Sequence, residues 1–333
     1  MNACHIAAVG AAAAERVAVD AIAADDAHAA ALRATVGLEA RHAPAGDIAP
    51  FELALDASRA ALDAAGLAPV DVDAIVQVGR MRVEYFSWGL SLALAKGLGH
   101  PTALCLDVTE VTGPSLVAGL LGAKFRADDR LQTALLVFPH RFSDCVDISA
   151  TEDRWLWPLS DGAGALVIRR GAGPGAVLGH AFASDGTAAR AIGLRTEVVD
   201  DGPEPDGFLH HEWALAKYYF VRDPDTWPSR VEARVAERLA ATIEAAAARA
   251  DVRLEDVSTV QTGFLYPGVA ARLRERLRLG RRLCVHTAHG MMGGAELAFA
   301  LPGLIADPEL RDRPLALAGF GLPGQFGAVI SSF

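Results

Sequence analysis

The side chains best suited to chemistry lie at two junctions where an apolar strand runs into a helix. LCLDVTEVTGPSLVAGLLG starts at Leu104 and contains Thr112, and LCVHTAHGMMGGAELAFAL starts at Leu283 and contains His286 and His289. Such junctions present side chains and unpaired backbone N–H groups to a ligand. A neutral histidine is the usual base for activating a hydroxyl or an amine. The sequence therefore leaves two interpretations of His289, a catalytic base or a structural histidine bonded to the backbone.

The two junctions belong to a longer internal repeat. FELALDASRAALDAAGLAPVDVDAIVQVG, from Phe51, parallels VAERLAATIEAAAARADVRLEDVSTVQTG, from Val235. Helices that alternate with buried strands indicate an α/β protein with mainly parallel sheets. Their repetition predicts two similar halves, residues 1–170 and 171–333. Ligands of such sheets bind at the carboxyl ends of the strands, here where the halves meet.

Residue spacing predicts the individual elements. We expect helices at 51–66, at 85–99 and around Trp213 and Tyr218–Tyr219, and strands at 5–9, 74–79, 134–138 and 165–168. Gly162 and Gly164 are expected to form a turn and a close backbone approach before the last of these strands, with Asp161 capping the turn.

Composition limits the functional classes. The chain has 333 residues, 52% of them hydrophobic, and a formal net charge of −10, which argues against a nucleic-acid partner. Its four cysteines form no CxxC pair, which is typical of buried thiols in a reducing cytoplasm. We see no secretory leader and no apolar stretch that predicts a membrane partner. His210, His211 and Glu212 have no third ligand at a defined spacing, so we predict no metal site.

Several segments resemble the thiolase superfamily, most closely its ketoacyl-ACP synthase III branch. Asp107-Val108 matches the end of the family strand that lies four residues before the reactive cysteine, and VGLEARHAP, from Val36, is similar to the family segment TGI-x-x-R. DRWLWPLSDGAGALVIRR, from Asp153, is similar to the family's DGAGA segment, and LAGFGLPGQFGAVI, from Leu317, is similar to its closing hairpin. The resemblance implies the thiolase fold, two βαβαβαββ halves stacked as five αβαβα layers.

The resemblance also implies where acyl transfer would occur. In the family, a cysteine is acylated while a histidine and an asparagine stabilise the thioester oxyanion. The corresponding positions of this sequence hold Thr112, Gly263 and Met291. A threonine hydroxyl needs an adjacent base, so we expect His289, or else His286, to serve Thr112 or an incoming amine or alcohol.

The rest of the implied site is made of backbone and small residues. We expect Gly263 and Met291 to contact the substrate, and we expect N–H groups of Thr112 and of the loop from Gly321 to Gly324 to form an oxyanion hole. The resulting prediction is an acyltransferase of natural-product or fatty-acid-derived biosynthesis. It would use acyl-ACP or acyl-CoA thioesters and no cofactor beyond the phosphopantetheine arm that carries the acyl group.

A basic segment follows Gly263. ARLRERLRLGRRL, from Ala271, places Arg272, Arg274 and Arg276 where the family has its carrier-protein docking helix. Acyl carrier proteins are acidic, so these arginines would steer them to the site. The other interpretation is an ordinary solvated helix face.

A second function fits the same residues. Loss of all three family side chains is typical of a non-catalytic subunit that pairs with an active thiolase-fold ketosynthase. Thiolase-fold proteins are typically dimers, so the sequence leaves a homodimer and a heterodimer open. We expect Glu110 to start a helix or contact the dimer partner, and Cys105 to be a core residue.

Overall fold

The computed structural model describes residues 4–43, 50–79, 89–108, 130–142, 146–147, 151–188, 192–198, 215–221, 224–321 and 324–333. Thr112, Glu110, His210, His211 and Glu212 lie outside this part of the chain. The strands are β1 (Cys4–Ala13), β2 (Arg16–Ala18), β3 (Ala40–His42), β4 (Ala74–Val78), β5 (Leu104–Val108), β6 (Thr133–His140), β7 (Gly162–Arg170), β8 (Ala176–Ser184), β9 (Ile192–Val198), β10 (Leu215–Val221), β11 (Val260–Thr262), β12 (Leu283–Val285), β13 (Pro314–Gly321) and β14 (Gln325–Ser332). The α-helices are α1 (Val19–Ile22), α2 (Asp26–Ala31), α3 (Pro50–Ala65), α4 (Leu90–Gly97), α6 (Ala233–Arg249), α7 (Pro267–Arg276) and α8 (Ala295–Ala306).

The main sheet consists of two blocks with the same strand order. Its ten strands run β12-β11-β13-β14-β8-β1-β7-β6-β4-β5, so the order β12-β11-β13-β14-β8 is repeated by β5-β4-β6-β7-β1. β4 is parallel to β5 and β6, just as β11 is parallel to β12 and β13. Cys105 and Cys284 occupy matching places in the two edge strands. A single register pair, His5 with Ala176, joins the two blocks.

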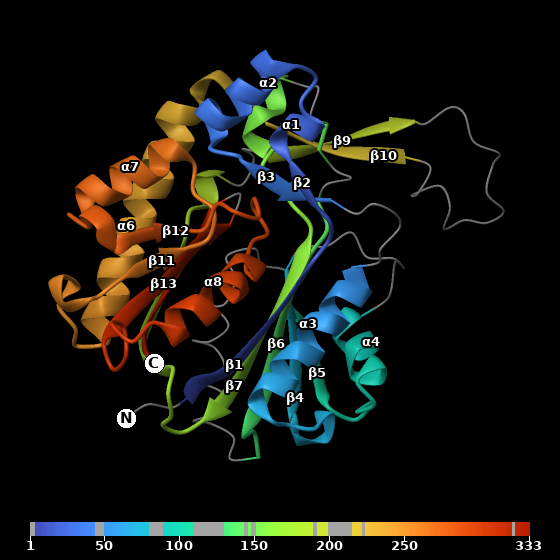
Figure 1. Ribbon diagram of the computed structural model, residues 1–333, viewed down its shortest axis with the longest axis vertical. Coiled ribbons are helices and arrows are strands. Elements are labelled where there is room, and N and C mark those ends of the chain that lie inside the picture. The colour runs from blue at the N-terminus through green and yellow to red at the C-terminus, as the bar shows by residue number, and fades with distance from the viewer. Residues whose placement is uncertain are drawn as a thin grey trace.

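Helices cover both blocks and also separate them. α3 packs on β1 and β7, α6 packs on β8 and β14, and α8 contacts β7 and β1 from the opposite side to α3. Figure 1 shows α3 and α4 on one outer side, α6 and α7 on the other, and α8 between the two strand blocks. This is the predicted five-layer α/β arrangement. The division into residues 1–170 and 171–333 stays a prediction.

The amphipathic pattern explains the outer helices. On α3 the buried residues Leu53, Ala54, Ala57 and Ala61 recur at helical spacing, and Gly66 ends the helix with a φ of 64°. The predicted helix 51–66 is therefore confirmed. The helix predicted from residue 85 is described from Leu90 onward and ends at Gly97.

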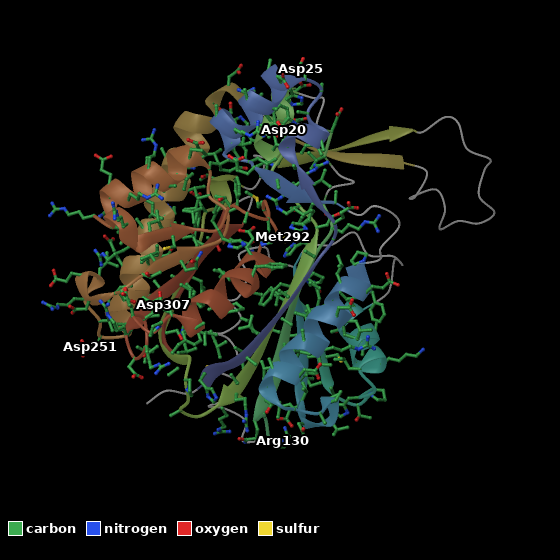
Figure 2. The ribbon with its side chains drawn as sticks, in the orientation of Figure 1. Asp20, Asp25, Arg130, Asp251, Met292 and Asp307 are labelled. Atoms are coloured by element: carbon green, nitrogen blue, oxygen red, sulfur yellow. The ribbon has the colours of Figure 1, made fainter. Side chains whose placement is uncertain are left out.

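One prediction of local structure is wrong, and another is right only in part. Gly162 and Gly164 lie within β7, not in a turn before it. The predicted close approach is present: a Cβ atom at Gly162 would be 2.7 Å from Sδ of Met292, and one at Gly164 would be 2.6 Å from Cβ of Ala298 on α8. Figure 2 shows the adjacent Met292 near the centre of the molecule, and this side chain is fully buried. Tyr218 and Tyr219 belong to β10, which pairs with β9, and not to a helix.

No helix of the described ranges is both long enough and apolar enough to cross a bilayer.

Candidate functional site

The candidate site lies beyond the carboxyl ends of parallel strands. β11 ends immediately before Gly263, and β12 ends immediately before His286. Carboxyl ends of parallel strands meet at one edge of a sheet. Both sequence-predicted positions of the second half are therefore brought to the same edge. The distance from Thr112 to His289 involves a residue outside the described part of the chain.

The loop that carries His289 is fixed to the segment before β7. The N–H of Met291 donates to the Pro158 carbonyl at 2.6 Å, and the N–H of Ser160 donates back to the Met291 carbonyl at 3.0 Å. Gly290 makes this contact possible, because its φ is 71° and a Cβ atom would lie 2.6 Å from the Pro158 oxygen. Met291 itself is half-buried. Backbone bonds therefore hold the loop in one conformation.

Three histidines stack in this loop region. Nε2 of His42 lies 2.7 Å from Nδ1 of His289, and the two rings are 4.8 Å apart, centroid to centroid. The rings of His286 and His289 stack at 4.9 Å. Phe299, from α8, covers His289 at 4.6 Å. The structure thus brings together both predicted histidines and adds a third from β3.

His42 is held by neighbours on several sides. Its Nδ1 lies 2.6 Å from the Ala14 carbonyl oxygen. Its backbone N–H donates to Oγ of Ser160 at 2.6 Å, and its carbonyl accepts from the N–H of Asp161 at 2.9 Å. Oδ1 of Asp161 accepts from the N–H of Phe142 at 2.7 Å, which makes Asp161 a structural residue.

Burial keeps the three histidines neutral at ordinary pH. Desolvation, followed by the nearby His286, His42 and Arg16, lowers the pKa of His289 to about 4. Desolvation is also the main cause that lowers the pKa of His42 and of His286. A neutral imidazole has a nitrogen lone pair and can accept a proton. His289 is only partly buried, so it can be reached from outside the stack.

A buried carboxyl group lies beside Gly263. The carboxylate oxygens of Glu296, on α8, accept hydrogen bonds from the backbone N–H groups of Phe264 and Met292. Burial raises the pKa of Glu296 to about 8, although its bonds to Phe264, Met292 and Gly293 act in the opposite direction. Any side chain at position 263 would collide with this carboxyl.

The remaining predicted positions are mostly structural. The N–H of Gly324 donates to the Gly321 carbonyl at 2.8 Å, so it is engaged within its own turn. Oδ2 of Asp107 accepts from the Ser91 hydroxyl at 2.7 Å. Burial, reinforced by Asp107, raises the pKa of the Cys105 thiol, which disfavours a reactive thiolate. No cluster of metal-ligating side chains occurs in the ranges that the structure describes.

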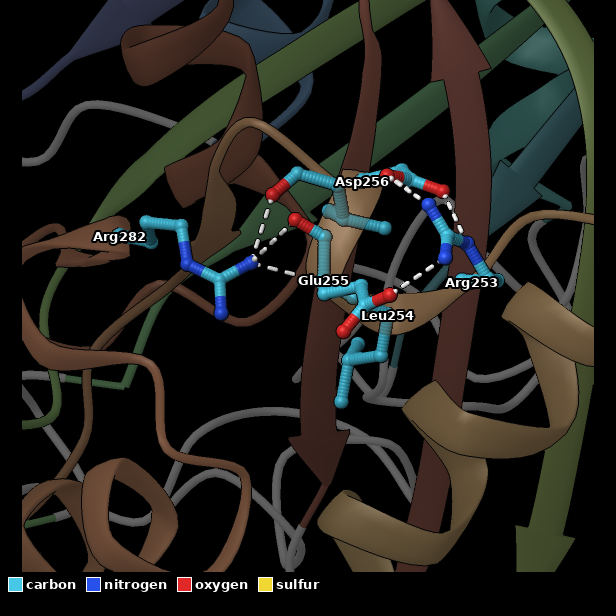
Figure 3. Close-up of polar contacts among 6 residues, drawn as sticks. Arg253, Leu254, Glu255, Asp256 and Arg282 are labelled. Atoms are coloured by element: carbon cyan, nitrogen blue, oxygen red, sulfur yellow. Dashed lines mark hydrogen bonds and ion pairs between the residues drawn. The ribbon is translucent and has the colours of Figure 1, made fainter.

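The basic segment divides into exposed and structural arginines. Arg272 and Arg274 are exposed on α7, whereas Arg276 pairs with Glu244 at 2.9 Å. Arg282 is structural, because its Nη1 donates to the carbonyls of Leu254, Glu255 and Val257 (Figure 3).

Sequence reasoning missed His42 and Glu296. His42 gave no local signal, because its partner His289 is far away in the chain. Glu296 did give one: it is the only charged residue in the otherwise apolar segment AELAFALPGLIA. A carboxyl group inside an apolar helix must find a partner or lose its charge.

Known proteins resemble the chain over most of its length. No protein-family model matches it. The β-ketoacyl-[acyl-carrier-protein] synthase III of Rhodobacter capsulatus is 26% identical over 310 residues, which cover 90% of this chain and 89% of that protein. The enzyme of the same name from Caulobacter vibrioides is 28% identical over 227 residues, or 66% of this chain and 64% of that protein.

Two solved structures superpose on nearly the whole chain. The 3-oxoacyl-(acyl carrier protein) synthase III of Pseudomonas aeruginosa PAO1 superposes with a TM-score of 0.80 at 25% identity, covering 99% of this chain and 98% of its own. The priming β-ketosynthase of the R1128 polyketide pathway gives a TM-score of 0.80 at 19% identity, covering 99% and 96%.

Proposed function

We propose that this chain is an acyltransferase. It has the thiolase fold and resembles β-ketoacyl-ACP synthases III over nearly its whole length. Its substrates would be acyl-ACP or acyl-CoA thioesters of natural-product or fatty-acid-derived biosynthesis. One observation carries this proposal: His289 is a neutral, partly exposed imidazole, hydrogen-bonded to His42 at the carboxyl ends of the parallel strands. Such a histidine is suited to general-base catalysis.

Two routes use the same base. In the first, His289 takes the hydroxyl proton of Thr112 while the Thr112 oxygen attacks the thioester carbonyl, and the thiol leaves. In the second, His289 takes the proton of an amine or alcohol that attacks the thioester directly. Both routes need a base that is neutral at pH 7, which the lowered pKa of His289 supports.

The carrier would dock on α7. Arg272 and Arg274 are exposed there, and Arg272 also lies close enough to the buried carboxyl of Glu232 to offset part of the burial that raises the pKa of Glu232. Positive charge on an otherwise acidic protein favours an acidic partner such as an acyl carrier protein. We propose these two residues as docking residues, with Arg276 contributing less because it is paired with Glu244.

We also propose a dimer, formed through the edge strand β5. Leu104 and Leu106 of this strand are 44% and 47% exposed, and Leu92 of the adjoining α4 is 61% exposed. An exposed apolar edge strand is a liability unless another chain covers it. The partner would be either a second copy of this chain or another thiolase-fold protein.

The second candidate function is a non-catalytic subunit of a thiolase-fold ketosynthase. The observation that favours it is the carboxyl of Glu296, which lies where a side chain at position 263 would otherwise project. A buried acid bonded to backbone N–H groups stabilises the loop and does not need a substrate.

Intact mass spectrometry distinguishes the routes. The protein is incubated with acyl-CoA and with acyl-ACP thioesters, with and without amine and alcohol acceptors. An acyl adduct that disappears in Thr112→Ala supports the covalent route. Acyl transfer to an acceptor without an adduct supports direct attack. If neither adduct nor transferred product forms with any thioester, while a ketosynthase co-purifies, the acyltransferase proposal is wrong and the subunit role stands.

A further inference from the structure

The two ring nitrogens of His42 have different partners. Nδ1 faces the carbonyl oxygen of Ala14 at 2.6 Å, and Nε2 faces Nδ1 of His289 at 2.7 Å. A carbonyl oxygen can only accept a hydrogen bond. The hydrogen of a neutral His42 therefore lies on Nδ1, and its Nε2 bears a lone pair.

This assignment determines the tautomer of His289. Because Nε2 of His42 has no hydrogen to give, the hydrogen in the bond between the rings belongs to Nδ1 of His289. The lone pair of His289 is then on its Nε2. No described residue hydrogen-bonds to that nitrogen, so it is available to a substrate.

We propose that His42 is a positioning residue that fixes His289 in the Nδ1–H tautomer and directs Nε2 of His289 toward the reacting group. The inference rests on the proposed function, in which His289 is the base. It goes beyond that function because it identifies the residue that decides which nitrogen acts.

The same hydrogen bond allows the proton to move on. When Nε2 of His289 takes a proton from a hydroxyl or amine, His289 becomes a cation. Its Nδ1 proton can then pass to Nε2 of His42, which leaves His289 neutral with hydrogen on Nε2. His42 then has hydrogen on both nitrogens and the positive charge, while its Nδ1–H still donates to Ala14. The reverse transfer returns the proton to a leaving thiolate.

Fixed neighbours make this role specific to His42. The bond to Oγ of Ser160 and the bond from the N–H of Asp161 hold its backbone. Desolvation and Arg16 disfavour positive charge on His42 and lower its pKa, whereas the bond to the Ala14 carbonyl and the charge of Asp161 favour it. If His42 were held only by packing, its ring could rotate and no longer fix the tautomer of His289. A positioning residue therefore requires anchoring of this kind.

Nuclear magnetic resonance of protein with 15N-labelled histidines tests the tautomer directly at pH 7. The His289 signals are identified by their loss in His289→Asn. We expect hydrogen on Nδ1 of His289 in the unmodified protein and in His42→Gln, whose side-chain oxygen can still accept. In His42→Phe we expect a shift toward Nε2–H, the form that predominates in free histidine. His100→Phe, a histidine with no described side-chain partner, is the matched control and should change nothing at His289.

Kinetics supply the second readout. We expect His42→Phe to reduce kcat about tenfold or more with little change in KM, and His42→Gln to retain most of kcat. Hydrogen on Nε2 of His289 in the unmodified protein, or an unchanged tautomer in folded His42→Phe, would overturn the inference. If the tautomer follows His42 as expected but His289→Asn transfers acyl groups at the normal rate, the positioning by His42 is supported while the proposed role of His289 fails.

Discussion

Gly263 and the carboxyl of Glu296 exclude each other's space. A Cβ atom added to Gly263 would collide with Oε2 of Glu296, although the two residues are on different elements. The absence of a side chain at 263 is therefore a condition for burying this carboxyl against the N–H groups of Phe264 and Met292.

We expect Gly263→Ala to destabilise the protein by about 1–3 kcal/mol, the usual range for overpacking a core. In a Glu296→Ala background the same change should cost at least about 1 kcal/mol less, because the obstacle is gone. Urea unfolding of the two single variants and the double variant measures this coupling. Gly303→Ala is the control: a Cβ atom there meets nothing, and alanine favours the interior of α8. If the destabilisation of the double variant equals the sum of those of the two single variants, the proposed steric conflict between positions 263 and 296 is contradicted.

The acidic limb of the activity profile should lie well below the pKa of free histidine. Desolvation, His286, His42 and Arg16 lower the pKa of His289 to about 4. The base therefore stays unprotonated, and kcat/KM should stay nearly constant between pH 7 and about pH 5.5. Measurement of thiol release from acyl-CoA across this range checks the prediction. A loss of half the activity near pH 6.5 would instead mean that an unshifted histidine is the base.

His140 should make the fold sensitive to acid. It is fully buried, neither ring nitrogen has a described hydrogen-bond partner, and burial lowers its pKa to about 3. The unfolded chain, with a pKa near 6.5, binds the extra proton first, so stability falls as pH decreases from 6.5 toward 3. Between pH 7 and pH 5 the free energy of unfolding should fall by up to about 2 kcal/mol more in the unmodified protein than in His140→Phe. Urea midpoints at both pH values give this difference, and an equal acid loss in both proteins would refute it.

Arg282 should matter for folding and its neighbour Arg281 should not. Arg282 donates to three backbone carbonyls around residues 254–257 (Figure 3). Arg281 is exposed and has no partner in the described chain. We expect Arg282→Met to cost about 1–3 kcal/mol and Arg281→Met less than about 0.5 kcal/mol. Thermal unfolding of the pair is the test, and equal effects would show that Arg282 acts only through its charge.

Arg274 should act on the carrier and not on the acyl group. We expect Arg274→Glu to raise KM for acyl-ACP about tenfold, with a salt dependence, and to leave KM for acyl-CoA unchanged. Arg59→Glu changes an exposed arginine on α3 by the same charge and serves as control. Parallel increases for both substrates would place Arg274 at the acyl site instead.

Periodicity and repetition predicted an α/β protein with two similar halves, and the resemblance to the thiolase superfamily added the five-layer arrangement. The apolar spacing of 51–66 predicted α3 because that helix buries one face. The repeated sequence corresponds to the parallel strand pairs β4–β5 and β11–β12, in which Cys105 and Cys284 have equivalent neighbours. Tyr218 and Tyr219 were misplaced because a short aromatic run does not distinguish strand from helix.

The site was only partly accessible from sequence. His286 and His289 were found because they follow a strand in a recognisable junction. The hydrogen bond between His42 and His289 could not be found, because it depends on β3 and the 286–294 loop meeting in space. The burial of Glu296 depends likewise on α8 lying against Gly164 and Gly263.

The single pairing between the two strand blocks has a mechanical consequence. His5 and Ala176 meet at the beginning of β1, whereas the strand's other end leads to Ala14 and the histidine stack. At that other end the two halves are tied again, by the backbone bonds of Met291 to Pro158 and Ser160 and by the His42–His289 bond. A rotation of one block about the His5–Ala176 pair would move this end of β1 most, so it would have to break these bonds first.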